Sequence, residues 1–303
     1  MKIVFAGSPE YSVPALEALH AEHGVAAVIT QPDRPVGRKK VLTPTAVKVC
    51  AERLDIPVLD FGRIRDHADE VRALGGDILV TCAYGQILTQ DILDCFPKGV
   101  WNLHASLLPE FRGASPIQSA IYAGKRYTGV TVMKTELALD SGDILLVKRC
   151  EVGEKTYGEL QEELSALSAR AAVEGVSLIM RGQTQLLMQD ESKVTYCKKI
   201  QKDDCKIDFK NSAADICRLI RAANPQPLAY CIHNGAILNI LKACEITAEG
   251  DVGSVICADK RGIAVKCGEG ALLISELLPA GGKRMSASDF VNGRKIKAGD
   301  ILD

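Results

Sequence analysis

The fold of this chain is decided by VWNLHASLLP, residues 100–109. Residues 100–104 have the length and apolar character of a buried strand, and the Ser-Leu-Leu-Pro segment that follows is typical of a turn. Because side chains two apart on a strand point to one face, Asn102 and His104 project together. Ligands of a parallel sheet bind beyond the carboxyl ends of its strands. The stretch therefore predicts a strand whose polar side chains lie at a ligand-binding edge.

Strands and helices alternate along the first two thirds of the chain. The predicted strands are residues 2–6, 25–30, 56–60, 78–83, 100–104 and 129–134, and the predicted helices are residues 14–22, 63–74, 116–123 and 157–181. We expect Ser12 and Ser115 to cap the helices that follow them. The pattern indicates an α/β fold, namely a Rossmann-like, mostly parallel sheet with right-handed crossovers and helices on both faces.

The composition changes after residue 181. Residues 182–206 are polar and rich in Lys and Gln, as is typical of a linker. Residues 207–303 begin with a predicted helix, and the short strands that follow are separated by glycines. That helix is residues 213–223, and the strands are residues 229–233, 236–246, 253–258, 262–267 and 271–278. We therefore expect domains at 1–181 and 207–303, the second a small OB-like β-barrel.

Composition excludes several classes of protein. The 303 residues are 47% hydrophobic and 25% charged, as in soluble globular proteins, and no apolar run approaches the roughly 18 residues of a membrane span. The apolar run after Lys2 is too short for a signal peptide, so we expect a cytoplasmic protein. The 11 cysteines are odd in number and never two residues apart, which favours reduced thiols and no structural metal. We also expect a monomer.

A net charge of -1 excludes binding to nucleic acid by bulk charge alone, but local basic segments remain. The clearest lies between residues 31 and 48, where Asp33 is the one acidic residue and the cations are Arg34, Arg38, Lys39, Lys40 and Lys48. Prolines and glycine break this segment, so we expect a mobile arm rather than a helix. It could contact phosphates or be an ordinary solvated charge run.

The strongest candidate for chemistry combines Asn102 and His104 with Asp140 of a downstream Asp-Ser-Gly turn. A carbonyl under attack becomes an oxyanion, which an Asn amide and an imidazolium can hold while a carboxylate orients the His. Ser106 could instead be a nucleophile, but it lacks the glycines of a nucleophile elbow. A nicotinamide cofactor is not expected, because GSPEYS at residues 7–12 lacks the later glycines of the dinucleotide fingerprint.

Several segments together resemble the folate-dependent formyltransferases, and among these the branch that acts on methionyl-tRNA. The matching segments are QPDRPVGR (31–38), HASLLPEFRGASPIQ (104–118), LDSGD (139–143), IRAANP (220–225) and PAGGKRMS (279–286). The resemblance implies transfer of formyl from 10-formyltetrahydrofolate, released as tetrahydrofolate, to the α-amino group of methionyl initiator tRNA. It also implies that Asn102, His104 and Asp140 are catalytic, with Asp143 a turn residue.

The same resemblance implies which residues bind the two substrates. The implied folate contacts are the loop before Asp140 together with Tyr84, Gly85, Gln86, Ile87, Leu88, Ser106, Leu107, Leu108 and Pro109. Ile87 and Leu88 could equally be ordinary core residues. The implied tRNA contacts are Arg34, Arg38, Lys39 and Lys40. Residues 207–303 hold 12 Lys and Arg against 11 Asp and Glu, so the second domain is not strongly basic.

Other functions remain open at this point. A related enzyme could formylate a sugar amine or glycinamide ribotide, or hydrolyse the formylated folate, with the same three residues. The basic arm and the second domain favour the tRNA enzyme over these. A non-catalytic RNA-binding protein on an enzyme scaffold is a third possibility, and the intact trio argues against it.

Overall fold

The computed structural model describes residues 1–37 and 39–303, so the predicted tRNA contact Arg38 lies outside the described residues. The chain divides into two compact units. The first comprises Met1–Pro116, Tyr127–Glu151 and Gln161–Cys197, and the second comprises Ile117–Arg126, Val152–Leu160 and Lys198–Asp303. The segment predicted as a linker, 182–206, is thus divided between the units at Cys197.

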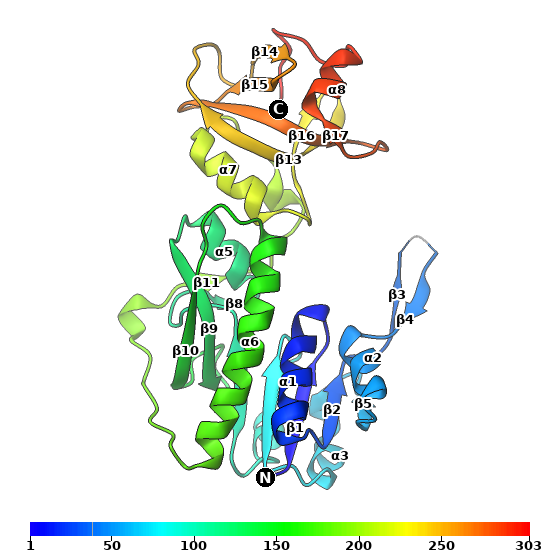
Figure 1. Ribbon diagram of the computed structural model, residues 1–303, viewed down its shortest axis with the longest axis vertical. Coiled ribbons are helices and arrows are strands. Elements are labelled where there is room, and N and C mark those ends of the chain that lie inside the picture. The colour runs from blue at the N-terminus through cyan, green and yellow to red at the C-terminus, as the bar shows by residue number, and fades with distance from the viewer. Residues whose placement is uncertain (38) are drawn as a thin grey trace. The chain divides into compact units, whose positions relative to one another are not determined.

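The first unit is built on a seven-stranded sheet with the order β10-β9-β7-β6-β1-β2-β5 (Figure 1). These strands are β1 (Ile3–Gly7), β2 (Ala27–Thr30), β5 (Val58–Asp60), β6 (Ile78–Cys82), β7 (Val100–His104), β9 (Tyr127–Lys134) and β10 (Ile144–Glu151). Five strands are parallel, whereas β9 and β10 are antiparallel to their neighbours. The predicted mostly parallel sheet is confirmed. Strand β10 was not predicted, and it lies at the edge with exposed residues in its second half.

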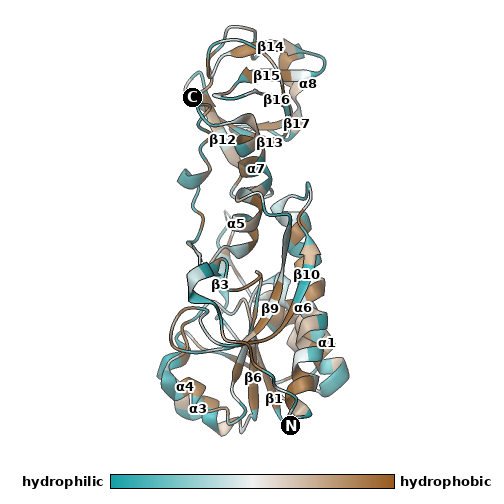
Figure 2. Cartoon of the chain, turned by 90° about the vertical axis from the view of Figure 1, so that its left-hand side faces the viewer, coloured by the Kyte–Doolittle hydropathy of each residue, from teal (hydrophilic) through white to brown (hydrophobic). Residues whose placement is uncertain are grey.

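Helices cover both faces of this sheet. In Figure 2, α1 and α6 lie on one side of the strands and α3 and α4 on the other. The helices of the first unit are α1 (Val13–His23), α2 (Ala46–Arg53), α3 (Ala68–Ala73), α4 (Gln90–Leu93) and most of α6 (Tyr157–Met180), with 3-10 turns η1 (Glu10–Ser12) and η2 (Ile64–Asp66). Helix α5 (Pro116–Tyr122) belongs almost entirely to the second unit. The helix predicted at 63–74 is therefore η2 followed by α3. Strands β1 and β6 are fully buried between the layers, and apart from Thr81 their side chains are apolar.

The predicted cap at Ser12 is wrong. Its hydroxyl makes no cap hydrogen bond and instead donates to the Cys82 carbonyl at 2.6 Å, tying the start of α1 to the end of β6. Tyr11 anchors the same turn to α6, because its hydroxyl lies 2.8 Å from that of Ser168 and its carbonyl accepts from Ser165 at 2.7 Å. These buried hydrogen bonds fix the first turn beside the carboxyl ends of the strands.

The predicted basic arm contains a hairpin. Strands β3 (Arg34–Val36) and β4 (Val41–Thr43) pair antiparallel and extend from the sheet in Figure 1. Helix α2 begins directly after them, because Thr45 accepts a hydrogen bond from the Lys48 amide at 3.1 Å and so caps it. Lys48 therefore belongs to a helix and not to the arm. We had not predicted α2, whose eight residues give a short signal.

The second unit is an antiparallel β structure, as predicted. Its strands are β12 (Ala229–His233), β13 (Ala236–Ile246), β14 (Val255–Asp259), β15 (Gly262–Lys266), β16 (Ala271–Pro279) and β17 (Met285–Ser286), in the order β12-β13-β16-β15-β14 with β17 against β16. Helices α7 (Ala213–Ala222) and α8 (Ala287–Asn292) pack on this sheet. The C-terminal residues join its two edge strands, because Asp303 pairs with Ile232 while the Asp300 carbonyl accepts from Val255.

Two kinds of feature are absent from the described residues, 1–37 and 39–303. No helix among them has the length and apolar character to cross a membrane. Within the same residues, no three His, Cys, Asp or Glu side chains gather in a way that could hold a metal ion.

Candidate active site

The candidate site lies at the carboxyl end of β7, between β6 and β9. His104 ends the strand and is only 5% exposed, and Asn102 lies two residues earlier on the same face. Asp140 comes from the turn that precedes β10. The tertiary fold thus brings Asp140 to His104, with 3.7 Å between the Asp140 carboxylate and His104 Nδ1.

Both ring nitrogens of His104 have a defined neighbour. Nε2 lies 2.9 Å from the backbone carbonyl of Phe111. A carbonyl can only accept, so Nε2 must carry a proton, and Nδ1, which faces Asp140, is left as the nitrogen that can exchange one. Protonation at Nδ1 produces an imidazolium beside a carboxylate. This arrangement suits a residue that stabilises negative charge on a substrate oxygen.

Backbone conformation holds Asp140 in place. Its φ is +47°, a left-handed value that side-chain-bearing residues adopt infrequently. The Asp140 carboxylate accepts a hydrogen bond from the Gly113 amide at 2.8 Å and remains partly exposed. The neighbouring Asp143 has a backbone role in the same turn, because its carbonyl accepts from the Lys134 amide at 2.9 Å.

Thr81 orients the Asn102 side chain, a contact that we had not predicted. The Thr81 hydroxyl on β6 lies 2.9 Å from Asn102 Oδ1, and the two residues are register partners on adjacent strands. Because the hydroxyl donates to the amide oxygen, the Asn102 NH₂ group is left to donate to a substrate oxygen. The signal in the sequence was a polar residue within the apolar strand ILVTC, residues 78–82.

The segment Ser106 to Pro109 is fixed by hydrogen bonds to β9. The fully buried Ser106 hydroxyl donates to the Glu110 carbonyl at 2.6 Å, which is the geometry of a turn. Thr131 accepts from the Leu108 amide at 3.2 Å and donates to the Ser106 carbonyl at 2.7 Å. The side chain of Leu108 packs with Met133 and Ile144, and the bond to Pro109 is cis. Leu107 is half-buried.

Most side chains of the predicted folate wall at residues 84–88 face the protein interior. Tyr84 and Leu88 belong to the core beneath α3 and α4, and burial raises the pKa of the Tyr84 hydroxyl. Gln86 joins loops, accepting from the Ile64 amide at 2.8 Å and donating to the Phe61 carbonyl at 2.9 Å. Ile87 is 80% exposed. Gly85 has a φ of +78° and leaves its backbone accessible.

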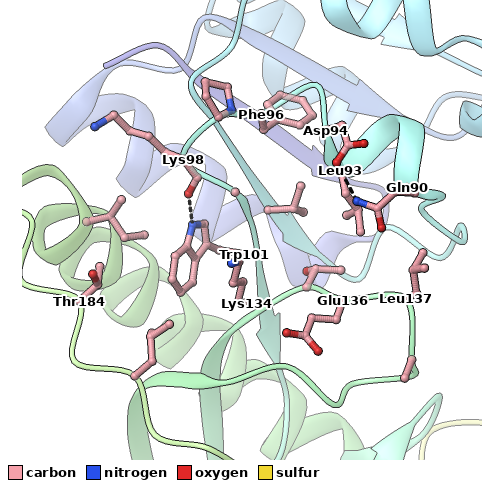
Figure 3. Close-up of a pocket in the computed structure, with 17 residues that line it drawn as sticks. Gln90, Leu93, Asp94, Phe96, Lys98, Trp101, Lys134, Glu136, Leu137 and Thr184 are labelled. Atoms are coloured by element: carbon pink, nitrogen blue, oxygen red, sulfur yellow. Dashed lines mark hydrogen bonds between the residues drawn. The ribbon is translucent and has the colours of Figure 1, made fainter.

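A depression of about 940 Å³ lies beside the loop before Asp140 (Figure 3). Glu136, Leu137 and Ala138 of that loop line one side, and the residues at 90–101 line another. Trp101 lies within it, and its indole donates to the Lys98 carbonyl at 3.0 Å. Val100 and Trp101, at the amino end of β7, line the depression, whereas Asn102, His104 and Asp140 do not. Residues 84–88 are not part of this lining, whereas Gln90 and Leu93 are.

The hairpin of the arm presents cations and exposed apolar side chains. Arg34, Lys39 and Lys40 are exposed, as are Val36, Val41 and Leu42. At its base, Lys48 of α2 lies 2.9 Å from both Asp33 and Asp60. Hydrogen bonds to Asp60 and then Asp33 outweigh desolvation and raise the pKa of Lys48 above its ordinary range. The arm is therefore joined to the sheet by one lysine between two carboxylates.

Comparisons with known proteins agree with this architecture. The sequence pattern of the formyl transferase family matches residues 1–176, and that of the formyl transferase C-terminal domain matches residues 199–295. Methionyl-tRNA formyltransferase of Bacillus velezensis is 42% identical over 308 residues, covering 99% of this chain and 97% of that protein. The corresponding protein of Xanthomonas euvesicatoria is 41% identical, covering 97% and 98%.

A solved structure shows the likeness in fold. The crystal structure of the N-formyltransferase from Helicobacter canadensis, in complex with folinic acid and dTDP-3-aminofucose, superposes with a TM-score of 0.68. It covers 90% of this chain and 99% of that chain at 18% identity, a level at which the likeness concerns fold alone. The sequence matches extend over both units, and on this evidence the chain belongs to the formyl transferase family.

Proposed function

We propose that this protein transfers a formyl group from 10-formyltetrahydrofolate to the α-amino group of methionyl initiator tRNA, in the cytoplasm. The observation that carries the proposal is the convergence of Asn102, His104 and Asp140 at one strand end. Support for the acceptor comes from relatives above 40% identity that span nearly the whole chain and are named methionyl-tRNA formyltransferases.

In the proposed reaction the acceptor amine attacks the formyl carbon, and the formyl oxygen takes up negative charge. Asn102, oriented by Thr81, donates its amide to that oxygen, and His104 donates from the ring nitrogen that faces Asp140. Asp140 stabilises the imidazolium and helps to remove the amine proton. When the intermediate collapses, the bond between the formyl carbon and N10 of the folate breaks, and the proton taken from the amine passes to N10 as tetrahydrofolate leaves. A donor aimed at a developing oxyanion typically contributes about 2.7 to 4 kcal/mol. The chemistry needs no covalent enzyme intermediate, in keeping with the internal hydrogen bond of Ser106.

The folate substrate would lie along the loop before Asp140. We infer that Glu136 to Ala138 form one wall of its pterin site and that the depression beside them supplies the space. Gly85 and the exposed Ile87 remain the candidates from the loop at 84–88, through backbone and apolar contact. The segment Ser106 to Pro109 would pass beside the substrate, contributing a fixed backbone.

The tRNA substrate would meet the arm first. Arg34, Lys39 and Lys40 are exposed and have no ion pair among the described residues, so they are available to phosphates. Arg38 is assigned to the same contact from the sequence. The near-neutral second domain would add contacts of its own, and the whole enzyme would act as a monomer.

Formyl transfer can be tested with three acceptor conditions. Purified protein is incubated with 10-formyltetrahydrofolate and charged initiator tRNA, with free methionine, or with no acceptor. We expect N-formylmethionyl-tRNA in the first reaction alone. Formylated free methionine would indicate a small-amine enzyme, and folate turnover without acceptor would indicate a hydrolase. Binding of tRNA with no transfer at all would indicate an RNA-binding protein, and each of these results contradicts the proposal.

A further inference from the structure

A buried arginine lies behind the catalytic cluster. Arg112 forms the short strand β8 (Arg112–Gly113) and is 2% exposed. Its guanidinium donates twice to Gln189 Oε1, at 3.1 and 2.9 Å, and pairs with Glu191 at 2.7 Å. Burial disfavours the charged guanidinium, but hydrogen bonding to Glu191 and then Tyr196 outweighs this and raises its pKa. A buried charge is stable only where its hydrogen-bond donors are satisfied, so the contacts with Gln189 and Glu191 fix where the Arg112 guanidinium lies.

Gln189 connects that arginine to the turn that carries Asp140. Its amide nitrogen donates to the backbone carbonyl of Asp140 at 2.9 Å and to that of Gly142 at 2.7 Å. The Gln189 side chain is 6% exposed. Its amide oxygen accepts both hydrogen bonds from Arg112, while its amide nitrogen donates to the two carbonyls. The left-handed conformation of Asp140 is thus held by a side chain from a distant segment.

The residues around Arg112 hold His104 and Asp140 through the backbone. The Phe111 carbonyl faces His104 Nε2, and the Gly113 amide donates to the Asp140 carboxylate. These two groups stand on either side of Arg112. Phe111 and Gly113 both have positive φ, of 60° and 123°. The whole turn is therefore held in an uncommon conformation with its two polar groups directed at the catalytic pair.

Strand β11 (Tyr196–Cys197) supports the same turn. It pairs with β8 in parallel, and a Cβ on Gly113 would lie 2.2 Å from the Cys197 carbonyl. Thr195 accepts from the Phe111 amide through its hydroxyl at 2.8 Å and from the Arg112 amide through its carbonyl at 2.9 Å. Residues 189–197 thus contact the catalytic turns at several points, although the sequence predicted this stretch as a linker.

We propose that Arg112 and Gln189 are positioning residues that set the geometry of His104 and Asp140. The inference rests on the proposed formyl transfer. Gln189 holds the Asp140 turn and Arg112 holds Gln189, so the two catalytic groups keep their 3.7 Å approach and His104 keeps its proton on Nε2. Neither residue touches the reacting atoms. Their loss lowers turnover and leaves substrate binding intact, since a displacement of about 1 Å at a catalytic group can lower the rate about 100-fold.

The decisive variant is Gln189→Glu. It preserves the size of the side chain and gives Arg112 a carboxylate partner, but it removes the two N–H donors to the Asp140 and Gly142 carbonyls. We expect kcat with charged initiator tRNA to fall about 10- to 100-fold, with both KM values within about two-fold of wild type. The control is Lys193→Gln, which removes an exposed ion pair with Asp190 in the same segment and leaves Arg112 and Gln189 untouched. That variant should keep kcat within about two-fold.

A readout that does not require activity separates this inference from the proposed function. In ¹⁵N-histidine NMR spectra, with His104→Gln used for assignment, wild-type His104 should show a single tautomer with the proton on Nε2. Gln189→Glu should broaden or shift this signal, and Lys193→Gln should not. If Gln189→Glu does not fold, Arg112→Lys provides a second variant. It keeps the charge but loses the paired guanidinium hydrogen bonds to Gln189, and the same change in the His104 signal is expected. An unchanged His104 signal and kcat in folded Gln189→Glu would overturn the inference. Absence of formyl transfer by wild type would overturn the proposed function alone.

Discussion

The cluster at the end of β7 and the basic hairpin of β3 and β4 differ in burial and in how firmly their side chains are held. The cluster is buried and over-determined: His104 is in contact with groups from two turns, and Asp140 is held by a backbone amide and a distant glutamine. The hairpin presents exposed side chains, and its base is linked to the sheet through Lys48. The difference indicates rigid positioning of chemistry in the first region and accessibility to a large ligand in the second.

Removal of the imidazole should produce the largest effect and test the first half of this comparison. His104→Ala should lose about 100- to 1000-fold in kcat, because the variant lacks the donor that we propose for the oxyanion. Folate binding, followed by fluorescence titration, should change little. Turnover close to that of wild type would remove His104 from the mechanism.

Charge reversal in the arm should test the second half. Arg38→Glu combined with Lys39→Glu should lower kcat/KM for tRNA about ten-fold or more and reduce the slope of log kcat/KM against log salt by about 1 to 2. The control reverses Arg65 of η2 and Arg72 of α3, which are exposed cations of the same unit. A salt slope equal to that of wild type would contradict a phosphate contact.

The hydrogen bond from Thr81 to Asn102 provides a smaller test of preorganisation. Thr81→Val removes a net contribution of about 1 kcal/mol and should lower kcat about five- to ten-fold, whereas Thr81→Ser should retain most activity. Thr128→Val is a matched control, because Thr128 is also a buried strand residue and its hydroxyl has no hydrogen-bond partner in the part of the chain that the structure describes. Equal kcat values for the valine and serine variants at position 81 would show that Asn102 is oriented by other groups.

The base of the arm should show the smallest effect. Lys48→Met should raise KM for tRNA about two- to five-fold without changing kcat, since partly exposed ion pairs each contribute at most about 1 kcal/mol. Arg53→Met, which removes the exposed pair with Glu17 from the same helix, is the control. Hydrogen bonds to Asp60 and Asp33 raise the pKa of Lys48, so its contribution is present below the unfolded pKa and lost only at higher pH. The KM effect should thus be constant from about pH 6 to 9, and a pH-dependent effect would argue against this ion pair.

Local patterns were sufficient to predict the architecture. The order of strands and helices in the first unit follows from runs of β-branched residues separated by amphipathic segments, and these signals depend on neighbours in sequence. Helix α2 and strand β10 were missed because α2 is short and β10 alternates only in its second half. Residues 182–206 were predicted as a linker from their polar composition. The contacts of Gln189 and Thr195 could not be predicted, because local composition does not distinguish buried polar side chains from solvated ones.

The sequence by itself determined which residues could carry the chemistry: the placement of Asn102 and His104 on one face follows from the period of a strand. Only the tertiary structure decided how they are held. Thr81 reaches Asn102 across 21 residues of sequence, and Arg112 reaches Gln189 across 77. Such contacts have no local period, because they depend on strand register and on turns with left-handed residues such as Phe111 and Asp140. The identity of the candidate catalytic groups is therefore local information, whereas their protonation and orientation are properties of the folded chain.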